Sequence, residues 1–91
     1  MRITVELSLY PLQGQPLAQI LRFIGRVQSD PRLEVAVNQM STQIRGELDD
    51  VMAVVGAALR ESFAAGGSQA LVAKFLNADL PILEPPDLRL R

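Results

Sequence analysis

The stretch QMSTQIRGELDDV, residues 39–51, changes the spacing of its apolar side chains at one glycine. Before Gly46, the series Met40, Thr42 and Ile44 alternates with polar residues, which is the pattern of a strand with one buried face. After Gly46, the apolar residues follow the spacing of one helical face: Leu48, Val51, Met52 and Val55. We therefore predict a strand that turns through Gly46 directly into a helix.

Three other segments also alternate and predict strands. Residues 3–9 place an apolar residue at every second position, and Pro11 ends this strand because proline cannot donate to a ladder. The segments RLEVAVNQ, residues 32–39, and SQALVAKFLNA, residues 68–78, continue the same pattern. The chain therefore contains four predicted strands.

Two helices separate these strands. The first follows Pro16, a residue suited to the first helical position, and stops at Ser29–Pro31. Its predicted buried stripe is Leu17, Ile20, Leu21, Ile24 and Val27. The second helix closes at Gly66–Gly67. Its predicted buried face is Leu48, Val51, Met52, Val55, Leu59, Ser62 and Phe63.

The order strand, helix, strand, strand, helix, strand predicts an α+β fold of the ferredoxin-like βαββαβ type. We expect a four-stranded antiparallel sheet in the order 4-1-3-2, with two helices on one face. The first and third strands are expected to be central and parallel to each other. Residues 1–78 form this domain in the prediction, and residues 79–91, which hold three prolines, form an extended C-terminal tail.

The sheet face without helices should carry the polar side chains of the two central strands. This predicted open face collects Thr4, Glu6, Ser8, Tyr10, Ser41, Gln43 and Arg45. Lys74 of the fourth strand is expected close to Glu6 as a cross-strand charge pair. Such a face is either solvated or packed against a second copy, and a short chain with a small core favours a homodimer or tetramer.

Composition excludes several classes of function. The 91 residues include no cysteine and no histidine, so the sequence holds no disulfide, thiolate nucleophile, histidine base or ordinary zinc site. The formal net charge of −1 offers no basic field for nucleic acid. No apolar run reaches the length of a membrane span, and the N-terminus alternates instead of forming a signal-peptide core. We expect a cytoplasmic protein that binds neither nucleic acid nor membrane.

The acidic segment GELDD, residues 46–50, invites a metal-site interpretation. Glu47, Asp49 and Asp50 instead lie in the first turn of the predicted helix, where carboxylates complement the helix dipole. No further acids cluster nearby to complete the oxygen shell of a hard cation. We expect no metal and no cofactor.

Two motifs together resemble a known family. The segments SLYPL, residues 8–12, and MSTQIRGELDDVM, residues 40–52, are similar to those of the YkoF-type thiamine- and hydroxymethylpyrimidine-binding family. The resemblance covers residues 3–77. It implies non-catalytic binding of thiamine or its pyrimidine precursor by single-domain subunits that associate through their sheets.

With that ligand, short polar groups and a stacking ring are the expected contacts. Tyr10 offers a ring face, Met40 an adaptable apolar contact, and Glu6 a charge to balance a thiazolium cation. The full candidate set is Glu6, Ser8, Tyr10, Asn38, Met40, Ser41, Thr42, Gln43 and Lys74. Each residue also has a plain structural interpretation, since strands commonly carry Ser and Thr, Met40 suits a core, and Glu6 can simply pair with Lys74.

Other functions compete with ligand binding. A regulatory or structural oligomerisation module that binds another small ligand or a protein partner would share this fold. An RNA-binding version would need several aromatic residues on the central strands, where only Tyr10 is available. Catalysis would have to rely on lysine or carboxylates. The sequence therefore favours a binding protein over an enzyme.

Overall fold

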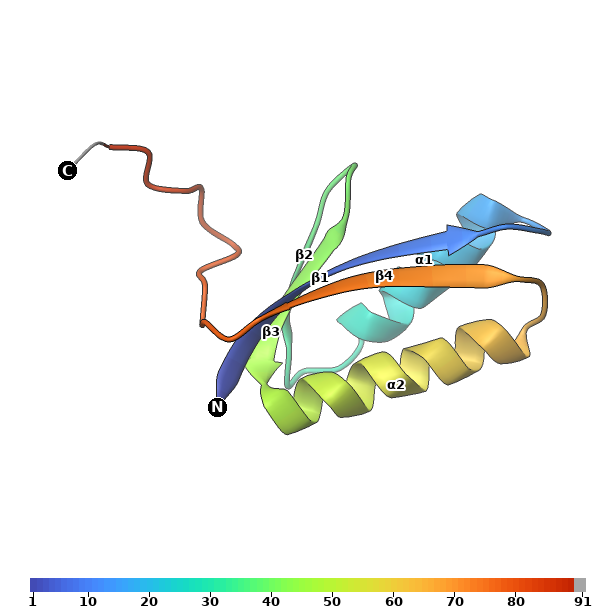
Figure 1. Ribbon diagram of the computed structural model, residues 1–91, viewed down its shortest axis with the longest axis horizontal. Helices are drawn as coiled ribbons and strands as arrows, with labels where there is room; N and C mark the ends of the chain where they lie inside the picture. Colours follow the sequence, from blue (N-terminus) through green and yellow to red (C-terminus); the bar gives the residue numbers. More distant parts are fainter. Residues whose placement is uncertain (90–91) are drawn as a thin grey trace.

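The computed structural model describes residues 1–89, and its elements follow the predicted order (Figure 1). They are β1 (Arg2–Pro11), α1 (Pro16–Gln28), β2 (Glu34–Val37), β3 (Thr42–Glu47), α2 (Leu48–Ala64) and β4 (Gln69–Leu76). The ferredoxin-like α+β fold is confirmed. In the described part of the chain, no helix has both the length and the apolar composition needed to cross a membrane.

The four strands form one sheet in the order β2-β3-β1-β4, as predicted. All three neighbouring pairs are antiparallel, including β1 with β3, so the expected parallel pairing of these two strands is wrong. The reason is the short turn between β2 and β3. This turn makes β3 run opposite to β2, whereas the helical crossover from β1 makes β1 and β2 run the same way.

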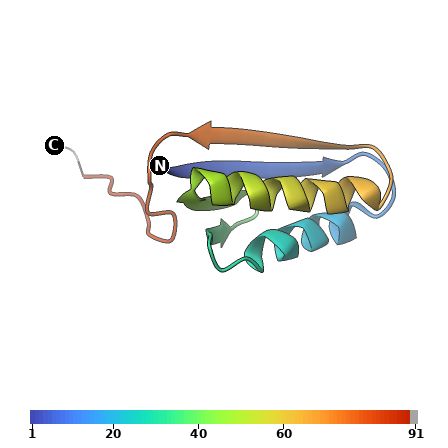
Figure 2. The same cartoon turned by 90° about the horizontal axis from the view of Figure 1, so that it is seen from below.

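Both helices cover the same face of the sheet (Figure 2). The register fixes which side chains they bury, because residues directly opposite each other in a sheet point to the same face. Leu7 lies opposite Thr42 and Ala73, and Val5 lies opposite Ile44 and Phe75. The buried apolar core is Ile3, Val5, Leu7, Leu9, Phe23, Val27, Leu33, Ile44, Val51, Val54, Val55 and Ala58.

Helix α1 is rotated relative to the predicted stripe. Val27 is buried and Ile20 packs partly buried against the core, as predicted. Leu17 and Leu21 are 69% and 59% exposed, whereas Gln19 and Phe23 are buried. The apolar residues of α1 cover more than one side, so periodicity alone does not choose the side that meets the sheet. Packing against both β1 and α2 brings Phe23 inward and leaves the two leucines outside.

Helix α2 shows the same effect. Val54 and Ala58 are buried although neither belonged to the predicted face, and Met52 and Phe63 are half exposed. The predicted positions that are buried include Val51 and Val55. The helix therefore has the predicted location but turns a neighbouring stripe of small residues toward the sheet.

Position 46 requires a glycine because neighbouring atoms leave no room for a Cβ, and not because the chain turns there. It lies within β3 opposite Ile3, and it is not among the glycines with positive φ. A Cβ at this position would lie 2.8 Å from Cδ2 of Leu33 and 3.3 Å from the carbonyl oxygen of Arg32. The interpretation of Gly46 as a turn glycine is therefore wrong, since the strand continues to Glu47 and the helix begins at the next residue.

We expect Gly46→Ala to lower the free energy of unfolding by about 1–3 kcal/mol, the usual cost of overpacking a core. The matched control is Gly56→Ala in α2, where nothing lies within 4 Å of the added Cβ. This control should raise stability by about 0.5–1 kcal/mol, because alanine is the better helix former. Urea unfolding followed by circular dichroism measures both. Equal effects would contradict the crowding of Gly46 by Leu33.

Candidate functional site

Four polar residues on the open face form one connected network. Glu6 lies between Gln43 of β3 and Lys74 of β4 in the register. Its Oε2 accepts a hydrogen bond of 3.0 Å from Oγ of Ser41, and that hydroxyl accepts one of 2.8 Å from Nε2 of Gln43. Nζ of Lys74 lies 3.6 Å from Oε1 of Glu6, which confirms the predicted charge pair. We call Glu6, Ser41, Gln43 and Lys74 the open-face network.

The other end of the open face is covered by the chain that follows β4. Oγ1 of Thr4 donates to the carbonyl oxygen of Ala78 at 2.7 Å and accepts from the amide of Leu80 at 2.9 Å. Nη1 of Arg45 donates to the carbonyl oxygen of Leu80 at 2.6 Å. Asp79 adds ion pairs with Arg2 and Arg45. These contacts bury Thr4 and hold residues 78–80 against the sheet.

A hollow of about 290 Å³ lies where this returning segment meets the open-face network. Glu6, Gln43 and Lys74 line one side of it, and Leu80 and Ile82 line the other. We call it the tail hollow. The C-terminal segment thus gives three of the candidate side chains an apolar wall.

A second hollow of about 250 Å³ opens beside the end of β1. The strand β1 runs to Pro11, but its pairing with β3 stops at Leu7, so Ser8 to Tyr10 have no β3 neighbour. Residues 38–42 around the tip of the β2–β3 hairpin line this gap together with residues of α1. Candidate residues that line this hairpin pocket are Ser8, Tyr10, Asn38, Met40, Ser41 and Thr42. Its apolar lining is Leu7, Leu9, Ile20, Phe23 and Ile24.

The hairpin tip is shaped by the side chain of Asn38. Its Oδ1 accepts hydrogen bonds from the backbone amides of Met40, at 2.9 Å, and Ser41, at 3.1 Å. This local turn ends β2 and delays the start of β3 to Thr42. Met40 therefore projects from the turn with 86% exposure, and its expected place on the core face of the strand is wrong.

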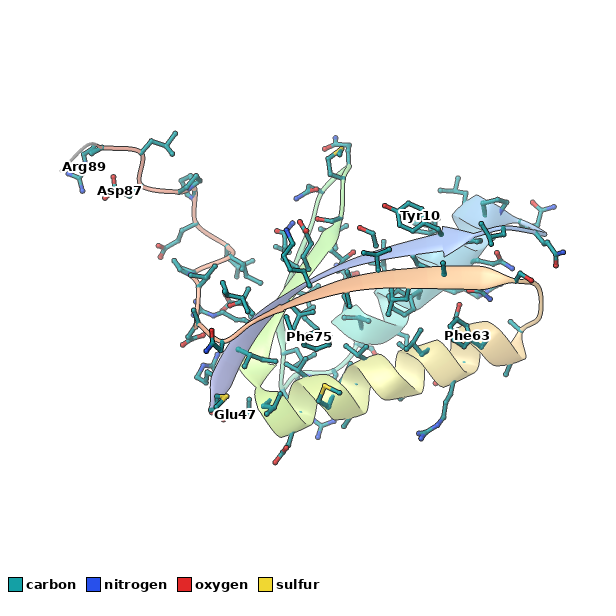
Figure 3. All side chains as sticks on the ribbon, in the orientation of Figure 1. Tyr10, Glu47, Phe63, Phe75, Asp87 and Arg89 are labelled. Atoms are coloured by element: carbon teal, nitrogen blue, oxygen red, sulfur yellow. The ribbon has the colours of Figure 1, made fainter. Side chains whose placement is uncertain are left out.

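Tyr10 and Thr42 reach the hairpin pocket from opposite faces of the sheet. Tyr10 is on the open face opposite Ala70 and is 52% exposed. Figure 3 shows Tyr10 and Phe75 on opposite sides of the sheet. Thr42 is 4% exposed and lies on the helix face opposite Leu7. The pocket is thus a gap in the sheet between its two faces, with polar groups at the rim and α1 behind.

The nine candidate residues fall into two neighbouring groups joined by hydrogen bonds from Ser41 of the first to Glu6 and from Gln43 of the second to Ser41. Six line the hairpin pocket and three line the tail hollow, and Ser41 of the first group bonds Glu6 of the second. Sequence reasoning missed Phe23 of α1 and Leu80 and Ile82 of the returning segment. A prediction that counted every apolar residue of α1 as a possible core residue would have included Phe23. The contribution of Leu80 and Ile82 depends on how the chain folds back and has no periodic signal.

Thr4→Val should release the segment that follows β4, because valine keeps the shape of threonine but can bond neither Ala78 nor Leu80. We expect the amide of Leu80 to exchange with solvent about tenfold faster, as the loss of a net hydrogen bond implies. Ser8→Val on the same face of β1 is the control and should leave that amide unchanged. Hydrogen exchange followed by NMR measures both, and unchanged protection in Thr4→Val would contradict the assigned anchor.

The sequence matches a family model described as thiamine-binding protein over residues 5–74, from β1 into β4. The chain belongs to the thiamine-binding protein family. This confirms the resemblance carried by the two sequence motifs. The matched range holds the complete hairpin pocket and the open-face network, whereas the segment after β4 lies outside it. The family is one of binding proteins, and its membership supports a thiamine-related binding role.

Solved structures place this thiamine-binding family member in a shared fold. A protein of Streptococcus pneumoniae has 21% identity and a TM-score of 0.78, covering 90% of this chain and 91% of that one. A Thermotoga maritima protein that is described as a thiamine biosynthesis or salvage protein has 19% identity and a TM-score of 0.79, with the same coverage. A Bacillus cereus domain of unknown function has 23% identity, a TM-score of 0.74, and coverage of 87% and 78%. No curated protein matches the sequence.

Proposed function

We propose that this protein binds thiamine or its hydroxymethylpyrimidine precursor in the hairpin pocket, without catalysing a reaction on it. Family membership supports the class of ligand. The observation that carries the proposal is the gap beside β1, where Ser8, Tyr10 and Ser41 meet an apolar lining from α1. Ligand pockets in proteins commonly combine an apolar wall with a few placed polar groups in this way.

The pocket suits an uncharged aromatic ring. An aminopyrimidine has ring-nitrogen acceptors and an amino donor. A hydroxyl group can donate a hydrogen bond to a ring nitrogen or accept one from the amino group, and Ser8 and Ser41 provide such hydroxyls. Tyr10 is half exposed and presents a ring for stacking. Among residues 1–89, no lysine or arginine lines the pocket. The pyrimidine half of thiamine therefore belongs in the hairpin pocket.

The cationic half of thiamine would extend toward the open-face network. Glu6 is the carboxylate of this network, and it is joined to the pocket because Ser41 both lines the pocket and donates to Oε2 of Glu6. Lys74 neutralises only part of this charge, because its ammonium lies 3.6 Å from Glu6 on the exposed side. A thiazolium ring over Glu6 would compete with Lys74 for the carboxylate.

The same proposal includes a homodimer or tetramer formed through the open face. The hairpin pocket, at about 250 Å³, is smaller than most ligand pockets and opens outward between its polar rim residues. A second sheet over Tyr10 and Val72, which are 52% and 59% exposed, would close it. The segment held by Thr4 occupies the opposite end of the face, so this region is left for a partner copy.

Calorimetric titration tests the ligand. We expect heat and thermal stabilisation with thiamine and with hydroxymethylpyrimidine, and none with hydroxyethylthiazole alone, because the pyrimidine provides the pocket contacts. Light scattering in parallel tests the assembly. A folded protein that gives neither heat nor thermal stabilisation with millimolar thiamine would overturn the ligand, and a monomer mass at micromolar concentration would overturn the sheet-to-sheet pairing.

A further inference from the structure

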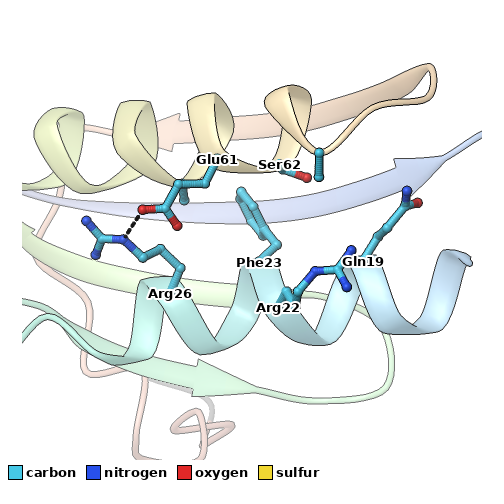
Figure 4. Close-up of a pocket in the computed structure, with 8 residues that line it drawn as sticks. Gln19, Arg22, Phe23, Arg26, Glu61 and Ser62 are labelled. Atoms are coloured by element: carbon cyan, nitrogen blue, oxygen red, sulfur yellow. Dashed lines mark hydrogen bonds and ion pairs between the residues drawn. The ribbon is translucent and has the colours of Figure 1, made fainter.

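A third hollow lies on the helix side of the molecule and shares Phe23 with the lining of the hairpin pocket. It runs between α1 and the C-terminal half of α2 and has a volume of about 270 Å³ (Figure 4). We call it the interhelix cleft. Four residues of α1 line it: Gln19, Arg22, Phe23 and Arg26. Its other wall consists of Ala58, Glu61, Ser62 and Ala65.

The base of the interhelix cleft is apolar. Phe23 is 4% exposed and Ala58 is 1% exposed, so both belong to the core and present only a small surface to the cleft. Ala65 at the end of α2 adds a short side chain that leaves space above them. A flat or slender apolar group of a ligand would fit against these side chains.

The amide of Gln19 is an unexplained polar group at this cleft. Gln19 is 9% exposed, and its buried Oε1 has no hydrogen-bond partner. Its Nε2 lies beside Gly14, since a Cβ built there would be 3.3 Å from it. Buried carbonyl oxygens in folded proteins nearly always accept a hydrogen bond. This oxygen has almost no accessible surface, so a donor from outside the chain would reach it when the side-chain amide of Gln19 rotates toward the cleft.

The charges of the interhelix cleft do not balance. Nε of Arg26 donates to Oε1 of Glu61 at 2.9 Å, and this pair spans the two helices (Figure 4). No ion pair or hydrogen bond engages the guanidinium of Arg22 within residues 1–89. One cation therefore remains at the rim, three residues from the unpartnered amide of Gln19 on the same helix.

We propose that the interhelix cleft is a second ligand site, for a small organic molecule that carries both an anionic group and an N–H donor. The anionic group pairs with Arg22, the N–H group donates to Oε1 of Gln19, and the apolar body lies on Phe23. A phosphate ester of an aminopyrimidine and an α-amino acid both have this chemistry. Among residues 1–89, no basic residue lines the hairpin pocket, whereas Arg22 and Arg26 line the interhelix cleft, so the anionic group favours the cleft.

The test is an NMR titration of the full chain with hydroxymethylpyrimidine phosphate, L-phenylalanine and inorganic phosphate. Shifts of the Gln19 side-chain amide and of the Arg22 Nε–H report the cleft directly. We expect one of the two organic compounds to shift both groups, and which of them binds identifies the source of the ligand. Inorganic phosphate, which has neither an N–H donor nor an apolar body, should bind at least about tenfold more weakly.

Two variants separate the contributions. Gln19→Leu removes the acceptor with an apolar replacement of similar length, and Arg22→Met removes the charge but keeps an apolar stem. Each should weaken binding of the organic compound about tenfold. Arg60→Met is the matched control, because this exposed arginine of α2 does not line the cleft, and it should bind like the wild type.

The proposal is overturned if neither organic compound shifts the Gln19 amide and the Arg22 Nε–H. It is also overturned if inorganic phosphate binds as tightly as both, or if Gln19→Leu and Arg22→Met bind like Arg60→Met. It does not depend on thiamine binding. Thiamine itself should perturb Ser8 and Tyr10 in the hairpin pocket and leave the Gln19 amide in place, so failure at one site is distinguishable from failure at the other.

Discussion

Ile44→Ala is expected to lower the free energy of unfolding by about 3–4 kcal/mol, the largest effect of any substitution that we consider. Ile44 is fully buried in β3 and lies opposite Val5 on one side and Val35 on the other. Removing its outer carbons takes apolar surface from the centre of the core and leaves a cavity that packed neighbours fill only in part. Urea unfolding at neutral pH measures the loss.

The control for this prediction lies four residues earlier in the chain. Met40 belongs to the same alternating series in the sequence, but the turn formed by Asn38 leaves it 86% exposed. Met40→Ala should change stability by less than about 0.5 kcal/mol, as surface substitutions usually do. A cost for Met40→Ala close to that of Ile44→Ala would mean that β3 begins earlier than Thr42 and that the hairpin pocket is differently built.

Ser41→Arg is expected to weaken thiamine binding at least about tenfold. Ser41 lines the hairpin pocket and its hydroxyl joins Gln43 to Glu6. Arginine at this position would place a cation next to Glu6, where the thiazolium is proposed to lie, and would fill part of the gap with its long side chain. The same cation would face its own copy in a sheet-to-sheet dimer, so association should weaken too.

Gln28→Arg is the matched control, because it adds the same charge at the exposed end of α1, away from the hairpin pocket. Calorimetry, light scattering and circular dichroism together separate ligand binding, association and folding. We expect an unchanged spectrum for both variants and weakened binding for Ser41→Arg alone. Full thiamine affinity in Ser41→Arg would argue against the hairpin pocket as the site, even if thiamine binding itself were established.

Local sequence pattern was sufficient for the number, type and order of elements. The alternation in residues 3–9 encodes β1, because a strand turns every second side chain to the same face whatever surrounds it. The pairing of Glu6 with Lys74 followed from strand order, since opposite residues of neighbouring strands must share a face. The two polar series of the central strands met on the open face for the same reason.

Helix faces were predicted less well, because a helix offers several overlapping stripes. Leu17 and Leu21 are as apolar as Phe23 and Val27, but only the latter two are buried. Which stripe becomes the interface depends on the side chains that the sheet and the neighbouring helix present. Those side chains come from distant parts of the chain, so the period of α1 does not contain that information.

The sequence by itself determined the ferredoxin-like fold, the division between covered and open sheet faces, and the family. Only the tertiary structure decided that Gly46 makes room for Leu33, that Thr4 holds the segment after β4, and that the hairpin pocket opens beside Ser8. The physical reason is the separation along the chain of the residues that act on one another. Periodicity records whether a side chain tends to be buried, whereas the space around it is set by residues that only folding brings into contact.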